Sequence, residues 1–352
     1  MNVTIKDVAL LANVAPSTVS RVIADSPRIS EATKQKVKQA MEQLGYHPNL
    51  NARNLASQST QALGLVMPSS KDVGFQNPFF PTVLQGISEG AQEKGYALHL
   101  TTGKSDVEIL EAVVQMVQGR RVDGVVLLHS KVEDKVISYL KEREFPFVLI
   151  GKPYIDVEEI THVDNDNIRA MKDATDYLIE LGHKQIGFIG GSLDLIVTVD
   201  RLNGYKKALT EADIEVKSEY IIHQEFLREG GQEAVRELMQ LKQHPTALVV
   251  ADDFMALGVL KTLDELGISV PNEISIIGFN NVLLAEMAKP PLTSVDINIF
   301  ELGFQASKNL IQKIENSNEP TKRLIISHRL VERLSCSRLY LREMGQMEVS
   351  EE

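Results

Sequence analysis

The 352-residue chain is predicted to join a small all-α helix–turn–helix domain to an α/β core of two doubly wound parallel-sheet lobes. First, residues 4–44 hold three short amphipathic stretches with helix-capping signals. Second, continuous apolar runs alternate with amphipathic stretches from residue 61 onward, which is typical of a parallel sheet covered on both faces. Third, this alternation occurs in two blocks of similar size, 61–161 and 162–292, which predicts two lobes with a cleft between them.

Residues 4–23 predict two short helices joined by a tight turn. Thr4 is suited to cap the first helix, because Asp7 follows three residues later and places a carboxylate in the first turn. Pro16 suits the first position of the second helix, where a missing N–H costs nothing. The apolar faces of the two helices are formed by Ile5, Val8, Ala9 and Ala12, and by Val19, Val22 and Ile23.

The second helix then presents polar side chains to solvent, namely Ser17, Ser20 and Arg21. A short polar helix that carries an arginine suits the major groove of DNA, and the Arg21 guanidinium is able to make a bidentate contact with guanine. Ser30 is predicted to cap a third helix that ends at Gly45. Residues 1–48 are therefore expected to form a DNA-binding domain.

The pattern T-I-K-D-V-A-x-x-A-x-V-x-x-x-T-V-S-R-V-I at residues 4–23 resembles the N-terminal signature of the lac-repressor (LacI/GalR) family of bacterial transcription regulators. The resemblance implies that Pro16 and Ser17 occupy base-reading positions, where their small side chains offer few hydrogen bonds. It also implies phosphate contacts, which fix the register of a protein on DNA without specifying sequence. The residues at those positions are Ser20, Arg28, Ser30, Thr33 and Tyr46, and Thr4 belongs to the same expected DNA-binding surface.

The segment 49–60 links the predicted head to the core. Residues 49–58 allow two turns of helix, and a helix this short is not stable alone in water. One interpretation is a solvated linker. The family resemblance favours a hinge helix that orders when it pairs with its twin on DNA. Leu55 then matches a wedge inserted from the minor groove, with Ala52 and Arg53 beside it.

The core is predicted to contain seven apolar strands and eight amphipathic helices. The strands are expected at 62–67, 97–100, 124–128, 147–150, 186–190, 247–251 and 274–279. The helices are expected at 78–94, 108–118, 133–143, 166–181, 201–212, 230–242, 254–266 and 300–315. Ligands in such folds bind at the carboxyl ends of the strands, which places a binding site in the cleft.

Further motifs of the same family follow in the family's order: N-P-F-F at 77–80, D-G-V-V at 123–126, L-x-x-L-G-H at 178–183, R-x-x-G-Y at 201–205, A-D-D-x-M-A-x-G at 251–258, G-F-N-N at 278–281 and P-P-L-T-S-V at 290–295. They imply an effector-binding core similar to periplasmic sugar-binding proteins, at 61–341, whose chain crosses between the lobes three times. The first lobe is expected to hold about 61–161 and 293–322, and the second about 162–292 and 323–341. An acidic tail is expected at 342–352.

Polar residues next to predicted strand ends are the main candidates for effector binding. Arg201 offers a rigid fork of donors for vicinal sugar hydroxyls or a carboxylate, and it is expected to head its helix. Asp252 and Asn280 offer natural partners for hydroxyl groups. Many family members carry Asn and Asp at these two places, so this exchange changes the donor and acceptor pattern. His129 and Ser130 follow a strand of the first lobe and are further candidates.

Three aromatic residues complete the expected effector site. Phe79 and Phe80 follow Asn77-Pro78 at a helix start, and one of them is expected in the core and the other in the cleft. Phe226 offers a flat platform for the face of a sugar ring, or it packs in the core.

The charge distribution favours DNA binding by the head alone. The net charge of the chain is −11, but residues 1–60 hold seven basic and four acidic residues. The head is therefore net positive at +3 and the remainder is −14, which localises the attraction to phosphates. Ordinary fluctuation in a short segment is the alternative explanation.

Several other classes of protein have no support in the sequence. The single Cys336 excludes an intramolecular disulfide framework and fits a reducing cytoplasm, and no Cys/His cluster has metal-ligand spacing. The chain lacks a signal peptide, a membrane-spanning apolar run, the common nucleotide-binding loops and the common hydrolase motifs. We therefore expect no catalytic residues, metal or cofactor.

The chain is thus expected to be a cytoplasmic, nucleoid-associated, homodimeric regulator, usually a repressor, that binds a double-stranded operator and a small sugar. Its N-P-F-F, A-D-D and G-F-N-N motifs look most like the maltose and maltodextrin-operon repressors of the family. A rival interpretation is a global carbon-catabolite regulator controlled by a phosphorylated carrier protein. That needs a basic docking surface, whereas helix 78–94 carries Glu89, Glu93 and Lys94. A sugar receptor that does not bind DNA is a second rival, and a sugar-modifying enzyme is a third.

Overall fold

The computed structural model describes residues 3–23, 26–46, 59–68 and 76–339. The chain divides into two compact units, residues 1–60 and 61–352, and each unit is described separately. The predicted hinge helix, with Ala52, Arg53 and Leu55, and the predicted acidic tail lie outside the described residues.

The first unit is the predicted three-helix bundle, α1 (Ile5–Leu11), α2 (Pro16–Ile23) and α3 (Glu31–Leu44). The Asp7 carboxylate accepts hydrogen bonds from the backbone N–H and the hydroxyl of Thr4, at 2.8 and 2.7 Å, and closes the start of α1. Ser30 accepts a hydrogen bond from the Thr33 N–H and caps α3. The predicted apolar faces meet in one small core whose buried members are Val8, Ala9, Val19, Val22, Val37 and Ala40.

The first lobe of the second unit is built on a six-stranded parallel sheet in the order β11-β5-β4-β3-β1-β2. Its strands are β1 (Ala62–Val66), β2 (Ala97–Thr101), β3 (Gly124–Leu127), β4 (Phe147–Ile150), β5 (His162–Asn165) and β11 (Arg323–Ile326). Its helices are α5 (Phe79–Gln92), α6 (Asp106–Gln118), α7 (Lys135–Glu142) and α13 (Ile299–Glu315).

The second lobe is built on a sheet in the order β12-β10-β9-β8-β6-β7, in which only β12 is antiparallel. Its strands are β6 (Ile186–Gly190), β7 (Ile221–His223), β8 (Ala247–Val250), β9 (Ser275–Phe279), β10 (Thr293–Asp296) and β12 (Arg329–Val331). Its helices are α8 (Asn167–Glu180), α9 (Ile196–Glu211), a 3₁₀ turn at Ser218–Tyr220, α10 (Arg228–Met239), α11 (Asp253–Glu265) and α12 (Leu283–Met287).

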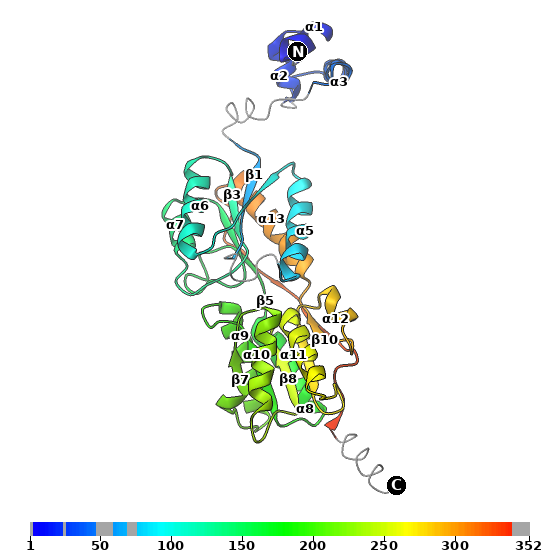
Figure 1. Cartoon of the computed structure of the whole chain (residues 1–352). Helices are drawn as coiled ribbons and strands as arrows, with labels where there is room; N and C mark the ends of the chain where they lie inside the picture. Colours follow the sequence, from blue (N-terminus) through cyan, green and yellow to red (C-terminus); the bar gives the residue numbers. More distant parts are fainter. Residues whose placement is uncertain (1–2, 24–25, 47–58, 69–75, 340–352) are drawn as a thin grey trace. The chain divides into compact units, whose positions relative to one another are not determined.

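Helices cover both faces of each sheet, as the continuous apolar strands predict (Figure 1). Along β1, Leu63 and Leu65 pack in the core under α5 and α13, whereas Val66 faces the core under α6 and α7. In the second lobe α8 and α9 cover one face and α10 and α11 the other. None of the described helices is long and apolar enough to cross a membrane.

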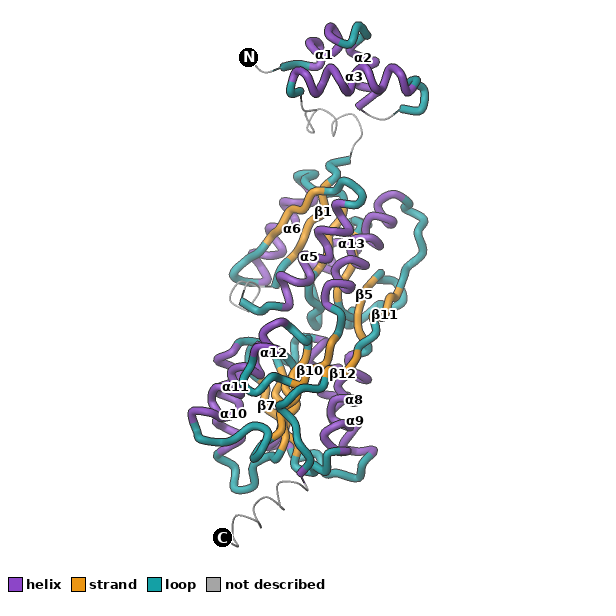
Figure 2. The backbone as a smooth tube through the Cα atoms, turned by 90° about the vertical axis from the view of Figure 1, so that its right-hand side faces the viewer, coloured by secondary structure: helices purple, strands orange, loops and turns teal. Residues whose placement is uncertain are grey.

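The three crossings between the lobes lie about four residues later than the sequence indicates. β5 and β11 belong to the first sheet, whereas we assigned residues 162–165 and 323–326 to the second lobe. β10 belongs to the second sheet, whereas we assigned its residues to the first lobe. The error arises because each of these strands is the last of its sheet before a crossing, and the crossing follows the strand's end (Figure 2).

Two further sequence predictions need correction. α9 begins at Ile196 and not at Arg201, so Arg201 lies inside the helix and does not head it. Residues 196–199 are largely β-branched, which disfavours a helix locally, but burial of Ile196 and Thr198 overrides that preference. The strands β5, β7, β10, β11 and β12 were not predicted, because they are short or rich in polar residues.

Close contact between α5 and α13 fixes the returning chain on the first lobe, and glycine permits it. A Cβ atom at Gly303 would lie 2.1 Å from the Val83 carbonyl oxygen, and one at Gly86 would lie 2.0 Å from the Phe300 carbonyl oxygen. No real Cβ atom tolerates such a contact with backbone, so the two helices approach here only because both residues lack a side chain.

We predict that Gly303→Ala lowers the free energy of unfolding by about 1–3 kcal/mol, because the added methyl forces α5 and α13 apart. Urea titration followed by circular dichroism measures the change. The control is Gln92→Ala, an exposed position of α5, which is expected to change stability by less than about 0.5 kcal/mol. Equal stability of the glycine variant and the wild type would contradict the packing described.

Candidate functional site

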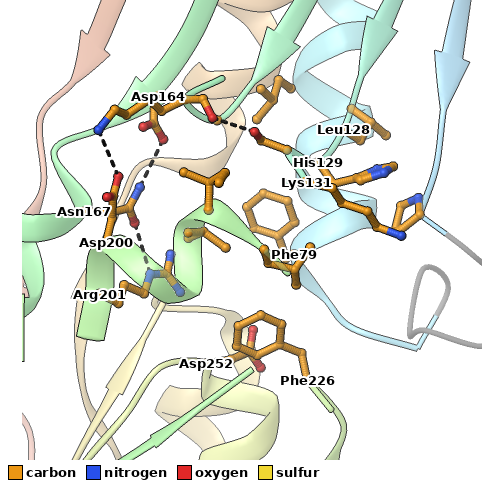
Figure 3. A pocket seen from close by; sticks show the side chains of 18 of the residues that line it. Phe79, Leu128, His129, Lys131, Asp164, Asn167, Asp200, Arg201, Phe226 and Asp252 are labelled. Atoms are coloured by element: carbon orange, nitrogen blue, oxygen red, sulfur yellow. Dashed lines mark hydrogen bonds and ion pairs between the residues drawn. The ribbon is translucent and has the colours of Figure 1, made fainter. Parts of the chain in front are cut away.

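A cavity of about 450 Å³ lies between the two lobes of the second unit, at the carboxyl ends of the strands. Side chains from both lobes line it (Figure 3). All of the residues proposed from the sequence for effector binding are among them, namely Phe79, Phe80, His129, Ser130, Arg201, Phe226, Asp252 and Asn280. Its volume is within the usual range for a small-molecule site.

The aromatic part of the wall comes from both lobes. Phe79 and Phe80 begin α5, and their rings meet edge to face with centroids 5.2 Å apart. Both are half-buried, both line the cavity and both pack against the hydrophobic core, so the expected division into one core residue and one cleft residue is not seen. Phe226 follows β7 in the other lobe, and its ring lies against the backbone of Gly191. A Cβ atom at Gly191 would lie 2.4 Å from that ring.

Arg201 is a buried cation that organises the wall on the second lobe. Its side chain is 5% exposed, its Nε donates to Asn167 Oδ1 at 3.0 Å, and its Nη1 donates to the Ala251 carbonyl. The guanidinium lies 3.8 Å from the centroid of the Phe279 ring. Burial lowers the pKa of Arg201 to about 10, while Asp252, Asp164 and Asp253 favour its charged form. The residue therefore remains a cation at neutral pH, with further N–H donors for a ligand.

Asp252 is largely occupied by contacts within the protein. Its carboxylate accepts from the backbone N–H groups of Phe254 and Met255, which caps α11. It also accepts from Asn280 at 2.8 Å and, across the cleft, from Asn77 at 2.9 Å. Burial raises the pKa of Asp252 to about 6, and the Asn77 hydrogen bond opposes the shift. Asp252 thus holds the two lobes together and leaves little capacity for a ligand.

Asn280 differs from Asp252 in carrying an unpaired side-chain oxygen. Its side chain is 4% exposed and lines the cavity, and its Oδ1 has no hydrogen-bond partner among the described residues. The backbone at Asn280 has a φ of 109° and that at Asn281 a φ of 53°, conformations that turn the chain sharply after β9. An unpaired buried oxygen is costly, so a donor from a bound molecule is favoured at this point.

The turn that carries Asn280 is held by a second buried carboxyl, that of Asp253. It accepts from the Val282 N–H at 2.9 Å and from the Ser294 hydroxyl at 2.7 Å. The Ser294 oxygen accepts in turn from the Asn281 N–H at 3.0 Å. Burial raises the pKa of Asp253 to about 8, so this group holds a proton near neutral pH.

The sequence analysis missed a polar cluster at the first crossing between the lobes. Asp164, Asn165 and Asn167 lie at the end of β5 and the start of α8, and all three line the cavity with Lys152 and Asp200. Asn167 donates to Asp164 at 3.0 Å, and Lys152 forms an ion pair with Asp200 at 3.7 Å across the cleft. Burial raises the pKa of Asp164 to about 7. The D-N-D-N pattern at 164–167 is the signal that would have located it, had β5 been recognised.

The loops that carry His129 and Ser130 close one side of the cavity. The Val132 N–H donates to the Asp194 carbonyl at 2.9 Å, and the Ile196 N–H donates to the Ser130 carbonyl at 3.2 Å. The Ser130 hydroxyl donates to the Lys152 carbonyl. Backbone hydrogen bonds therefore join loops of the two lobes.

The head presents the predicted DNA-binding residues on its surface. Pro16, Ser17, Ser20 and Arg21 are exposed on α2, opposite the buried Val19 and Val22. Exposure is also seen for Thr4, Arg28 and Ser30, whereas Thr33 and Tyr46 are half-buried. Tyr46 packs against the core of the head.

No group of three or more metal-ligating side chains occurs in the part of the chain that the structure describes. Amide, carboxyl and guanidinium groups of the cavity wall, those of Asn77, Asn167, Arg201 and Asp252, are hydrogen-bonded to neighbouring groups of the protein.

Comparison with known proteins agrees with this geometry. The family model "Bacterial regulatory proteins, lacI family" matches residues 4–49, and the model "Periplasmic binding protein-like domain" matches residues 175–336. The HTH-type transcriptional regulator MalR of Streptococcus pneumoniae serotype 4 is 42% identical over 344 residues, which cover 95% of this chain and 100% of that protein.

Two solved structures are similar as well. A putative LacI transcriptional regulator from Bacillus cereus subsp. cytotoxis NVH 391-98 has a TM-score of 0.77 and 54% identity, over 79% of this chain and 98% of that chain. The transcriptional regulator CelR in complex with cellobiose has a TM-score of 0.75 and 33% identity, over 95% of this chain and 100% of that chain.

A helix–turn–helix head joined to a two-lobed core with a polar cavity defines a DNA-binding transcriptional regulator. With full-length relatives at this identity, the chain belongs to the LacI family of bacterial regulatory proteins.

We predict that Asp253 makes the core less stable as pH rises from about 5 to 8. Its pKa is about 8 in the folded chain and ordinarily 3.8, so the folded state holds a proton that the unfolded state releases. Asp252 adds a like charge, and Arg333 partly offsets it. Asp253→Asn is neutral at every pH and keeps a donor and an acceptor for Ser294 and Val282.

Urea titrations of both proteins at several pH values measure this effect. The stability of the variant relative to wild type is expected to rise by at least about 1 kcal/mol between pH 5 and pH 8. A difference that is the same at every pH would show that Asp253 is ionised throughout.

Proposed function

We propose that this chain is the repressor of a maltose or maltodextrin operon, that it binds a pseudopalindromic operator as a homodimer in the cytoplasm, and that a small sugar in the cavity releases it. The observation that carries the proposal is the cavity itself. Its wall has the Phe226 ring opposite Phe79, with Arg201 near them (Figure 3). The unpaired Oδ1 of Asn280 belongs to the same wall. A sugar presents apolar ring faces and hydroxyl edges, and this wall offers a partner for each.

The relatives support a sugar of this class. MalR of S. pneumoniae is similar over the whole chain, and the CelR structure was solved with cellobiose, a disaccharide. Maltose is therefore the first sugar to test, followed by longer maltodextrins.

The sugar is proposed to act by differential affinity for two arrangements of the lobes. A ligand shifts such an equilibrium only by the difference between its affinities for the two states. Contacts to Arg201 in one lobe and Phe79 in the other are completed only when the lobes are closed. Closure then weakens operator binding by disturbing the hinge helix proposed at 49–58.

The protein is proposed to have no enzymatic role. The buried carboxyls at the cavity, Asp164 and Asp252, accept hydrogen bonds from neighbouring amides. A catabolite regulator controlled by a carrier protein is less well supported. Glu93, directly after α5, pairs with Lys308 of α13 at 4.0 Å, which gives that surface a mixed charge and not a basic one.

We predict that Arg21→Ala weakens operator binding about 10- to 100-fold, because one bidentate base contact contributes about 1–3 kcal/mol. Fluorescence anisotropy with DNA fragments from beside the chain's own gene measures it, with and without maltose. The control is Arg228→Ala, which removes an exposed arginine of the second unit. This variant is expected to bind the operator as wild type does. Wild-type binding no tighter than to random DNA would contradict the proposal. Tight binding that maltose does not relieve would refute only the choice of sugar.

We also predict that Gly191→Ala weakens maltose binding about 5- to 10-fold, because the new methyl displaces the Phe226 ring from the cavity wall. A double-mutant cycle with Phe226→Ala, measured by titration calorimetry, isolates this cause. In the Phe226→Ala background, Gly191→Ala is expected to change the affinity for maltose less than about twofold. Full additivity of the two changes would mean that Gly191 acts by another route.

A further inference from the structure

The three chain crossings between the lobes meet at one side chain, that of Asn165. The first crossing follows Asn165 at the end of β5, the second passes Ile297 between β10 and α13, and the third leaves β11 at Ile326. The Nδ2 of Asn165 donates to the Ile297 carbonyl at 3.0 Å and to the Ile326 carbonyl at 2.9 Å. One amide group therefore joins the first crossing to both of the others.

The surroundings make these two hydrogen bonds difficult to replace. Asn165 is 3% exposed, Ile297 is 1% exposed and Ile326 is 8% exposed, so water has little access to either carbonyl. A buried carbonyl that loses its donor keeps the cost of desolvation. Where β10 and β12 pair in the second sheet, Arg329 also donates twice to Asp296, at 3.0 and 3.1 Å, and links the second and third segments again.

A chain of hydrogen bonds connects Asn165 to the cation in the cavity. Arg201 Nε donates to Asn167 Oδ1, and Asn167 Nδ2 donates to the Asn165 carbonyl at 3.3 Å (Figure 3 shows the Arg201–Asn167 part). Arg201 belongs to the second lobe and Asn165 to the sheet of the first. A ligand that shifts Arg201 thus acts on the residue to which all three crossings are tied.

The backbone of the second crossing turns at a defined place, Asn298. Asn298 has a left-handed backbone with a φ of 54°, and its N–H donates to Asp296 at 2.9 Å. Lobe closure requires φ and ψ changes in all three crossings, and hinges absorb such changes in a few terminal residues. Segments tied by one amide cannot bend independently.

We propose that Asn165 is a positioning residue that makes the three crossings bend as one hinge, so that sugar binding in the second lobe moves the first lobe and thereby the operator-binding head. This inference rests on the proposed sugar response. The proposal assigns the coupling between sugar and operator to a residue outside the DNA-binding head. A residue with a role in folding alone would not change this coupling.

The test measures operator affinity at zero and at saturating maltose for wild type, Asn165→Ala and Asn165→Ser, with saturation verified for each protein. The ratio of the two affinities is the coupling. We expect Asn165→Ala to lower the ratio at least about fivefold while the sugar-free operator affinity stays within about threefold of wild type. Asn165→Ser, whose hydroxyl still donates to one carbonyl, is expected to fall between them.

The matched control is Asn309→Ala, which removes a buried amide that donates to the Gln305 carbonyl within α13 and does not touch a crossing. It is expected to keep the wild-type ratio. A wild-type ratio in Asn165→Ala would overturn the inference, and so would an equal fall in Asn309→Ala. If Asn165→Ala does not fold, Asn165→Ser decides by the same criterion.

Amide hydrogen exchange separates failure of this inference from failure of the proposed function. If maltose does not change the operator affinity of the wild type, the proposed sugar is wrong. Amide exchange measured without ligand then tests the hinge. Asn165→Ala must then speed exchange in both 296–299 and 326–329, although neither segment is mutated, and Asn309→Ala must not. If either segment keeps its wild-type exchange rate in Asn165→Ala, the hinge is refuted.

Discussion

The structure of the cavity depends on the burial of one cation, Arg201. A guanidinium removed from water is tolerated only where its charge and its donors are met. Here Asn167 and the Ala251 carbonyl accept from it, and the Phe279 ring lies against it. Its three neighbouring carboxyls, those of Asp164, Asp252 and Asp253, favour its charge. These partners come from β5, β8, β9 and the helices that follow β5 and β8, so the position of Arg201 fixes the relation between those elements.

The contacts across the cleft follow from the same requirement. Buried polar groups must pair, and the buried Asn77 pairs with the buried Asp252. The partly exposed Lys152 adds an ion pair with Asp200. Backbone hydrogen bonds between the loops at 130–132 and 194–196 add to them. The structure therefore has a cavity closed by contacts that are few and separable. A ligand changes the balance between closed and open lobes by adding to these contacts or replacing them.

The sequence predicted the fold where its signal was strong. Strands such as β4 are continuous apolar runs because helices cover both faces, and these were found almost to the residue. β5, with the sequence HVDN, is buried although three of its four residues are polar, and it was missed. That single omission displaced the first lobe boundary and hid Asp164, Asn165 and Asn167 from the predicted site.

Other features depend on contacts between distant parts of the chain. The loss of Asp252 as a free ligand partner follows from Asn77, which lies 175 residues away in the other lobe. The free acceptor on Asn280 depends on a left-handed turn held by Asp253 and Ser294. Such pairings leave no periodic pattern in the sequence. The predicted DNA contacts of α2 stay predictions, supported by the exposure of Ser17, Ser20 and Arg21.

The central claim, that the cavity around Arg201 is a sugar site, is tested most directly by titration calorimetry of the full chain. Maltose, maltotriose, ribose and guanine are each titrated into the wild type and into Arg201→Lys, with thermal unfolding of both proteins as a check. Lysine cannot reproduce the planar fork that binds Asn167 and stacks on Phe279. We expect maltose or maltotriose to bind the wild type and to bind the variant at least about tenfold more weakly. Binding of guanine or ribose alone, or equal binding of maltose by both proteins, would contradict the account.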